Sequence, residues 1–142
     1  MRFLQALLML LTMAVVMRAD GVPTVVTYVS HEKVTFARGS RLVNDNGLIV
    51  LANRRGAGEV EVHKNEHHLF IIVEGEATFV TGGTMINPKE TSPGHLAASD
   101  VQGGQVHQLR KGDVITIPAS TPHWFKEVPT KTIAFYAVNT IP

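Results

Sequence analysis

The sequence predicts an all-β domain, built as a sandwich or a barrel. Short runs rich in Val, Ile, Thr and Phe recur along the chain, and Gly, Asn, Asp and Pro separate them, which is typical of such folds. The 142 residues suffice for one domain of ordinary size. A content of 44% hydrophobic and 18% charged residues is that of a folded protein. We therefore expect a single all-β domain over residues 20–142.

The first 19 residues differ in character from the rest. Arg2 precedes the apolar run Phe3–Met17, and Ala19 stands before Asp20. Fifteen helical residues span about 22 Å, less than the ~30 Å hydrocarbon core of a bilayer. This pattern resembles a secretory signal peptide, with an uncleaved membrane anchor as the alternative. We expect a secreted or periplasmic protein with no stable membrane association after cleavage.

The elements of the mature chain follow from local composition, taken in chain order. Val22–Val29 is expected to form a strand, and residues 31–38 a short N-terminal helix between the N-cap Ser30 and the stop Gly39. Further strands are expected at Leu48–Asn53, Glu59–His63, Leu69–Val73, Ala77–Thr81, Val106–Leu109, Val114–Ile117, His123–Lys126 and Thr132–Val138. The stretch 84–104 is too long for a hairpin turn, and we expect it to form an inserted hairpin near the mouth of a barrel.

Charge and residue usage restrict the possible chemistry. A formal net charge of +1 argues against a nucleic acid partner. The chain has seven His and no Cys. The absence of Cys excludes a disulfide framework, a thiolate metal site and a cysteine nucleophile. Metal binding or acid–base catalysis would therefore rest on imidazole and carboxylate groups.

The most informative segment is EVEVHKNEHHLFIIVEGEATFVTGG, residues 59–83. Glu61 and His63 are two positions apart, so on a strand they share one face. Strict alternation would place His67 on that face as well, whereas a turn through Lys64–Glu66 would bring His68 there instead. The pattern alone leaves both alternatives open.

This segment resembles the first metal-binding motif of the cupin superfamily, G-x5-H-x-H-x(3–4)-E-x6-G. Seven positions before Gly75 lies His68, where the family has Glu. Five positions before His68 lies His63, which matches the second His of the motif. Glu61 occupies the position of the first His, and Gly56 falls close to the leading Gly. The family's set of three His and one Glu is present, with Glu and one His exchanged in position.

The second cupin motif, G-x5-P-x-G-x2-H-x3-N, resembles KGDVITIPASTPHWFKE near the C-terminus. Gly112, Pro118 and His123 match, while Ser120 replaces Gly and Glu127 replaces Asn. The resemblance covers most of residues 47–138. It implies an RmlC-like β-barrel, the double-stranded β-helix.

The resemblance also implies a function. Glu61, His63, His68 and His123 would hold a divalent metal, which could be Fe, Mn, Zn, Ni or Cu, since imidazole and carboxylate suit all of these. Glu61 would be the fourth ligand or a general base. The protein would then be a dioxygenase, an isomerase or a lyase acting on a small oxygen-bearing molecule, and a homodimer. The alternatives are a non-catalytic module that binds a small ligand or metal, and metal-free acid–base catalysis by His63 or His123.

The remaining His have less specific interpretations. His31 and His67 are expected at the surface. His95 and His107 are most simply polar surface residues, although either could close over the barrel mouth as an acid–base group.

Overall fold

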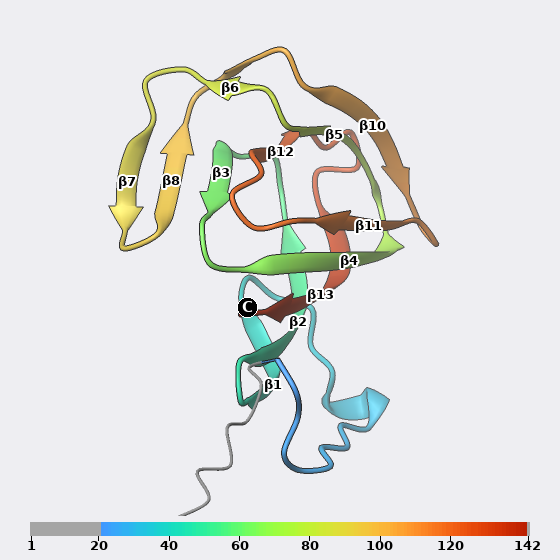
Figure 1. Ribbon diagram of the computed structural model, residues 1–142. Helices are drawn as coiled ribbons and strands as arrows, with labels where there is room; N and C mark the ends of the chain where they lie inside the picture. Colours follow the sequence, from blue (N-terminus) through green and yellow to red (C-terminus); the bar gives the residue numbers. More distant parts are fainter. Residues whose placement is uncertain (1–20, 142) are drawn as a thin grey trace, which may run out of the picture.

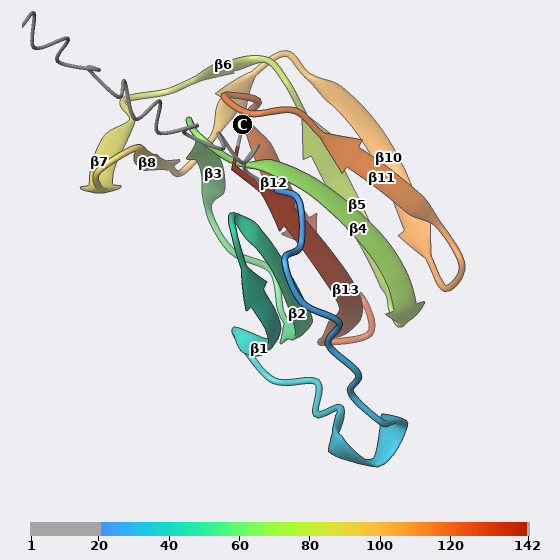
Figure 2. The ribbon, with the colours of Figure 1, turned by 60° about the horizontal axis from the view of Figure 1, so that its bottom comes forward.

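A five-stranded and a six-stranded antiparallel sheet enclose a shared apolar core in the computed structural model, which describes residues 21–141 (Figures 1 and 2). The first sheet has the order β1 (Ser40–Asp45), β2 (Leu48–Arg55), β13 (Ile133–Thr140), β4 (His67–Glu74) and β11 (Val114–Ile117). The second has the order β10 (Gln105–Arg110), β5 (Glu76–Thr81), β12 (His123–Glu127), β3 (Val60–His63), β8 (His95–Ala98) and β7 (Lys89–Ser92). The all-β prediction is confirmed. Within residues 21–141, no helix is long and apolar enough to cross a membrane.

Alternation of inward and outward side chains explains why the core strands form. On β4, His68, Phe70 and Ile72 are buried while the neighbouring residues are more exposed. Phe79 of β5 and Phe125 of β12 pack with ring centroids 4.6 Å apart. The Phe70 ring lies 6.1 Å from that of Phe125. Burial of these rings together with the aliphatic residues of the same core stabilises the domain.

Two turns depend on backbone conformations that suit Gly and Asn. Asn46 and Gly47 both have positive φ, 45° and 79°, as a tight hairpin between β1 and β2 requires. Gly75 joins β4 to β5 at φ 86°, and a Cβ there would lie 2.5 Å from the carbonyl oxygen of Thr132. Only Gly is therefore compatible with the Gly75 position.

The N-terminal part of the described chain differs from the prediction. Val22–Val29 forms no strand, because no other strand pairs with it; the Asp45 carboxylate instead accepts the backbone N–H groups of Thr24 and Val25. The helix expected over 31–38 is only a three-residue 3-10 turn, His31–Lys33, labelled η1. Its N-cap side chain makes no capping hydrogen bond and none of its residues is buried, so nothing extends it. The predicted signal peptide, 1–19, lies outside the described residues.

The expected inserted hairpin is present between residues 84 and 102. The short strands β6 (Thr84–Met85) and β9 (Val101–Gln102) pair at its base. Beyond them β7 pairs with β8, and β8 pairs with β3, so that the hairpin extends the six-stranded sheet (Figure 1). In this register His95 of the hairpin lies opposite His63.

Candidate metal centre

Three histidines from three strands meet inside one end of the barrel. His63 ends β3, His68 lies near the start of β4, and His123 begins β12. One nitrogen from each ring lies within 4.8 Å of the other two. Both His68 and His123 are only 5% exposed. The structure thus brings together the three predicted imidazole ligands.

The turn between β3 and β4 decides which of two adjacent histidines faces inward. β3 ends at His63 and β4 begins at His67, and the three intervening residues break the alternation. His68 consequently points into the barrel. The His67 side chain lies outside, where its Nδ1 accepts the backbone N–H of Ala119 at 3.0 Å.

Hydrogen bonds fix the protonation of two of the three rings. His68 Nδ1 lies 2.8 Å from Asn139 Oδ1, and His123 Nδ1 lies 3.0 Å from the carbonyl oxygen of Thr121. Both oxygens are acceptors, so each Nδ1 carries the proton and each Nε2 keeps a free lone pair. His68 Nε2 is buried and has no hydrogen-bond partner among the described residues. An unpartnered, buried lone pair of this kind suits a metal ion.

The surroundings keep these rings neutral. Burial lowers the pKa of His123 to about 4, and the nearby His68 and His63 act in the same direction. Burial also lowers the pKa of His68, which the hydrogen bond to Asn139 offsets only in part. Since a metal binds neutral imidazole, both rings have the required form at neutral pH.

Glu61 lies beside the three histidines but is engaged elsewhere. Its Oε1 and Oε2 accept hydrogen bonds from Arg55 at 2.9 and 3.1 Å. Burial acts to raise the pKa of the Glu61 carboxyl, but Arg55 outweighs it and the pKa lies below its usual range. Glu61 is not part of the metal-compatible group found in residues 21–141. A role as fourth ligand or general base stays a prediction.

Glu66 and Asn139 belong to the site, although neither was singled out from the sequence. Glu66 Oε2 lies 3.7 Å from His63 Nδ1 and accepts a hydrogen bond from Asn139 Nδ2 at 3.4 Å. The interaction with His63 lowers the pKa of the Glu66 carboxyl below its usual range, although partial burial opposes it. The position of Glu66, three residues after His63 in a turn, was the available signal.

The two weaker histidine candidates occupy different places. The His95 ring lies 4.5 Å from that of His63, and its Nε2 is 3.7 Å from Glu66 Oε1. The inserted hairpin therefore places an imidazole at the rim of the centre. His107 Nε2 instead bonds Thr81 Oγ1 at 2.8 Å and is not part of the three-histidine group.

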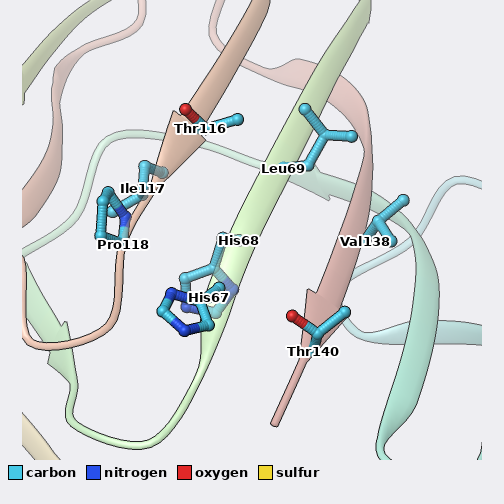
Figure 3. Close-up of a pocket in the computed structure, with 8 residues that line it drawn as sticks. All are labelled: His67, His68, Leu69, Thr116, Ile117, Pro118, Val138 and Thr140. Atoms are coloured by element: carbon cyan, nitrogen blue, oxygen red, sulfur yellow. The ribbon is translucent and has the colours of Figure 1, made fainter. Parts of the chain in front are cut away.

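Two hollows include residues on or next to the candidate ligands. One, of about 290 Å³, lies over β4, β11 and β13 and is mostly apolar (Figure 3). Its lining residues are His67, His68, Leu69, Thr116, Ile117, Pro118, Val138 and Thr140. The other, of about 240 Å³, is polar and includes Arg38, Arg55, Glu59 and Glu61. The apolar hollow lies on the outer face of the five-stranded sheet, because Leu69, Thr116 and Val138 alternate with inward-facing residues. The polar hollow is the one that reaches Glu61, beside the centre.

The donor set fits a transition metal ion. Zn–N bonds are about 2.0–2.1 Å long, so two nitrogens of a tetrahedral site lie roughly 3.4 Å apart. The candidate nitrogens of His63, His68 and His123 all lie within 4.8 Å of one another, so small movements of the rings would bring them to that separation. Three imidazole ligands also leave room for water or substrate in the remaining positions.

Comparison with known proteins agrees with this architecture. Similar solved structures include an RmlC-like cupin with a double-stranded β-helix fold from Methanocaldococcus jannaschii (16% identity, covering 85% of this chain and 94% of that one, TM-score 0.50). A second is a protein from Bacillus halodurans (17% identity, covering 81% of each chain, TM-score 0.56). A third is a protein from Thermus thermophilus (15% identity, covering 82% of this chain and 98% of that one, TM-score 0.53). At these identities the likeness concerns the fold, and it confirms the predicted RmlC-like barrel. No functionally curated protein matches the sequence. The family model described as Cupin matches residues 15–141, and the chain therefore belongs to the cupin family.

Proposed function

We propose that the protein binds a divalent transition metal ion through His63, His68 and His123. The observation that carries this proposal is the buried Nε2 of His68, which has no hydrogen-bond partner among the described residues and lies in a three-histidine group. Leaving such polar atoms unsatisfied is costly, and a bound ion would remove the cost at the ring nitrogens that face it.

We further propose that the metal centre acts on a small oxygen-bearing organic molecule, as a dioxygenase, an isomerase or a lyase. A bound metal would supply Lewis acidity toward an oxygen of the substrate. The neutral, hydrogen-bonded rings of His68 and His123 would hold the ion, and the polar hollow of about 240 Å³ that includes Glu61 would admit a small ligand. Glu61 would serve as base or fourth ligand after leaving Arg55.

A non-catalytic binding module is the second candidate, and the Arg55–Glu61 ion pair favours it. Because both oxygens of Glu61 are held by one guanidinium, this carboxylate is not free to accept a proton from a substrate. Oxygen consumption by the iron-loaded protein with catechols, flavonols and diketones separates the two. Turnover supports an enzyme, and saturable binding without turnover supports the module.

The adjacent histidines of β4 offer a matched test of metal binding. We expect tag-free protein reloaded with Zn²⁺, Fe²⁺ or Mn²⁺ to hold close to one ion per chain. His68→Ala should lose it, because an inward ligand is removed, whereas His67→Ala should retain it, since that ring faces outward. Elemental analysis measures both. An empty wild-type protein after reloading, or equal metal content in the two variants, would refute the proposal.

Export is also proposed, supported by the basic start and short apolar run of residues 1–19. The mature protein would then meet its metal outside the cytoplasm.

A further inference from the structure

We propose that Glu66 is a positioning residue of the metal centre, which orients two of its three ligand rings through a single carboxylate. The inference rests on the proposed metal binding by His63, His68 and His123. Glu66 lies in the turn between β3 and β4, and its side chain is 21% exposed. It contacts His63 directly and reaches His68 through Asn139 of β13.

The direct contact joins the Glu66 carboxylate to Nδ1 of His63. Nδ1 of this ring is buried, lacks a hydrogen-bond partner among the described residues, and faces Glu66 Oε2 at 3.7 Å. A carboxylate only accepts hydrogen bonds, so it favours a proton on the nitrogen nearest to it. With that proton on Nδ1, the lone pair of His63 is on Nε2. A small approach of Glu66, from 3.7 Å to about 2.9 Å, would complete the hydrogen bond.

The indirect contact sets the direction of the Asn139 amide. An amide has one donating and one accepting end, and the carboxylate of Glu66 can pair only with the donating end. Asn139 Nδ2 therefore faces Glu66 at 3.4 Å, and Oδ1 is left to accept from His68 Nδ1 at 2.8 Å. A reversed amide would donate to Nδ1, move the ring proton to Nε2 and block the ligand position of His68.

The second carboxylate oxygen of Glu66, Oε1, faces a histidine of the inserted hairpin. Glu66 Oε1 lies 3.7 Å from Nε2 of His95 on β8, whose ring packs against His63. One acidic side chain thus neighbours two imidazoles and reaches a third through an amide. A surface carboxylate without a role in the centre would not need this set of contacts. Hydrogen-bonded carboxylates behind histidine ligands are a general means of fixing their tautomer and orientation.

The decisive variant is Glu66→Gln, which keeps the shape but adds a donor and removes the charge. We expect it to weaken Co²⁺ binding by about 10–100-fold and to change the visible d–d bands of bound Co²⁺. Asn139→Leu should weaken Co²⁺ binding to a similar extent. The double variant should lose less Co²⁺ binding free energy than the sum of the two single losses, because both residues act on His68 through the same hydrogen bonds. The control is Glu74→Gln at the other end of β4, where the carboxylate pairs with Arg54 instead; its Co²⁺ affinity should equal that of the wild type.

Ring-nitrogen NMR of the metal-free protein tests the tautomers directly, first in the wild type and then in Glu66→Gln. We expect the proton on Nδ1 of both His63 and His68, and a mixture of tautomers in Glu66→Gln. A wild-type His68 protonated on Nε2 would overturn the inference even if the variants failed to fold. So would Co²⁺ affinity and tautomers in Glu66→Gln that match the wild type. If wild-type protein binds no Co²⁺, the proposed metal centre itself fails, whereas the two outcomes above count against Glu66 alone.

Discussion

At the scale of single residues, burial determines the protonation of two rings of the candidate centre, His68 and His123. Each donates one ring proton to a neighbouring oxygen and is held neutral by burial. The same burial makes protonation of either ring unfavourable in the folded state. Acid should therefore act on stability as well as on metal binding.

We expect the free energy of unfolding of the metal-free protein to fall as the pH is lowered. The folded pKa of His123, about 4, lies below the value of about 6.5 for an unperturbed His. Between pH ~6.5 and pH ~4 the unfolded chain therefore binds more protons than the folded one. The free energy of unfolding should fall by about 2–3 kcal/mol as the pH is lowered across this range. Urea unfolding from pH 7.5 to 4.5 measures this. His123→Gln should flatten the pH dependence and His67→Gln should not; an unchanged slope in His123→Gln would contradict the assignment.

Single residues also show where sequence reasoning stops. His63 and His123 could be identified from motif spacing, and His68 by counting from Gly75. The choice between His67 and His68 depended on a turn whose register no pattern fixes. Glu66 and Asn139 were missed because they are 73 positions apart, and their contact exists only once β4 and β13 are paired.

At the scale of elements, alternation predicted the core strands well and the edges poorly. Val114–Ile117 forms β11 with the predicted bounds, and Ala77–Thr81 forms β5 with one residue added. Val22–Val29 has strand-forming residues but no pairing partner. Ser40–Asp45 was not predicted, because its polar sequence SRLVND gives little signal, yet it pairs with β2.

The aromatic core that joins the two sheets gives a stability prediction. Phe79 is 0% exposed and packs against Phe70 and Phe125. Phe79→Ala should lower the free energy of unfolding by about 3–5 kcal/mol, while Val106→Ala, at a position 59% exposed on β10, should change it by less than about 0.5 kcal/mol. Denaturant titration gives both values. A loss below about 1 kcal/mol for Phe79→Ala would show that this ring does not hold the sheets together.

At the scale of the whole molecule, we propose a homodimer that uses the outer face of the five-stranded sheet. Val114 of β11 pairs with Ile71 of β4, and these side chains are 61% and 36% exposed. They continue the outward face of Leu69 and Thr116, which line the apolar hollow (Figure 3). Adjacent exposed apolar side chains on a sheet face are typical of association surfaces.

Light scattering after gel filtration tests this surface. We expect the mass of a dimer for the wild type and of a monomer for Val114→Lys, because a charge would be buried between the copies. Val106→Lys is the matched control, since Val106 is equally exposed but lies on β10 of the other sheet. A monomeric wild type, or a dimer in both variants, would contradict the proposed interface.

The position of β13 has a consequence for how the chain acquires its fold. The last strand of the sequence is the middle strand of the five-stranded sheet, between β2 and β4, and it carries Asn139 (Figure 2). β2 and β4 cannot be joined until residues 133–140 have left the ribosome, and pairing of strands so far apart in sequence is slow. In a nascent chain the five-stranded sheet would therefore stay open until residues 133–140 have emerged. That delay would suit the proposed export, because an incompletely folded chain passes more easily through a narrow translocation channel.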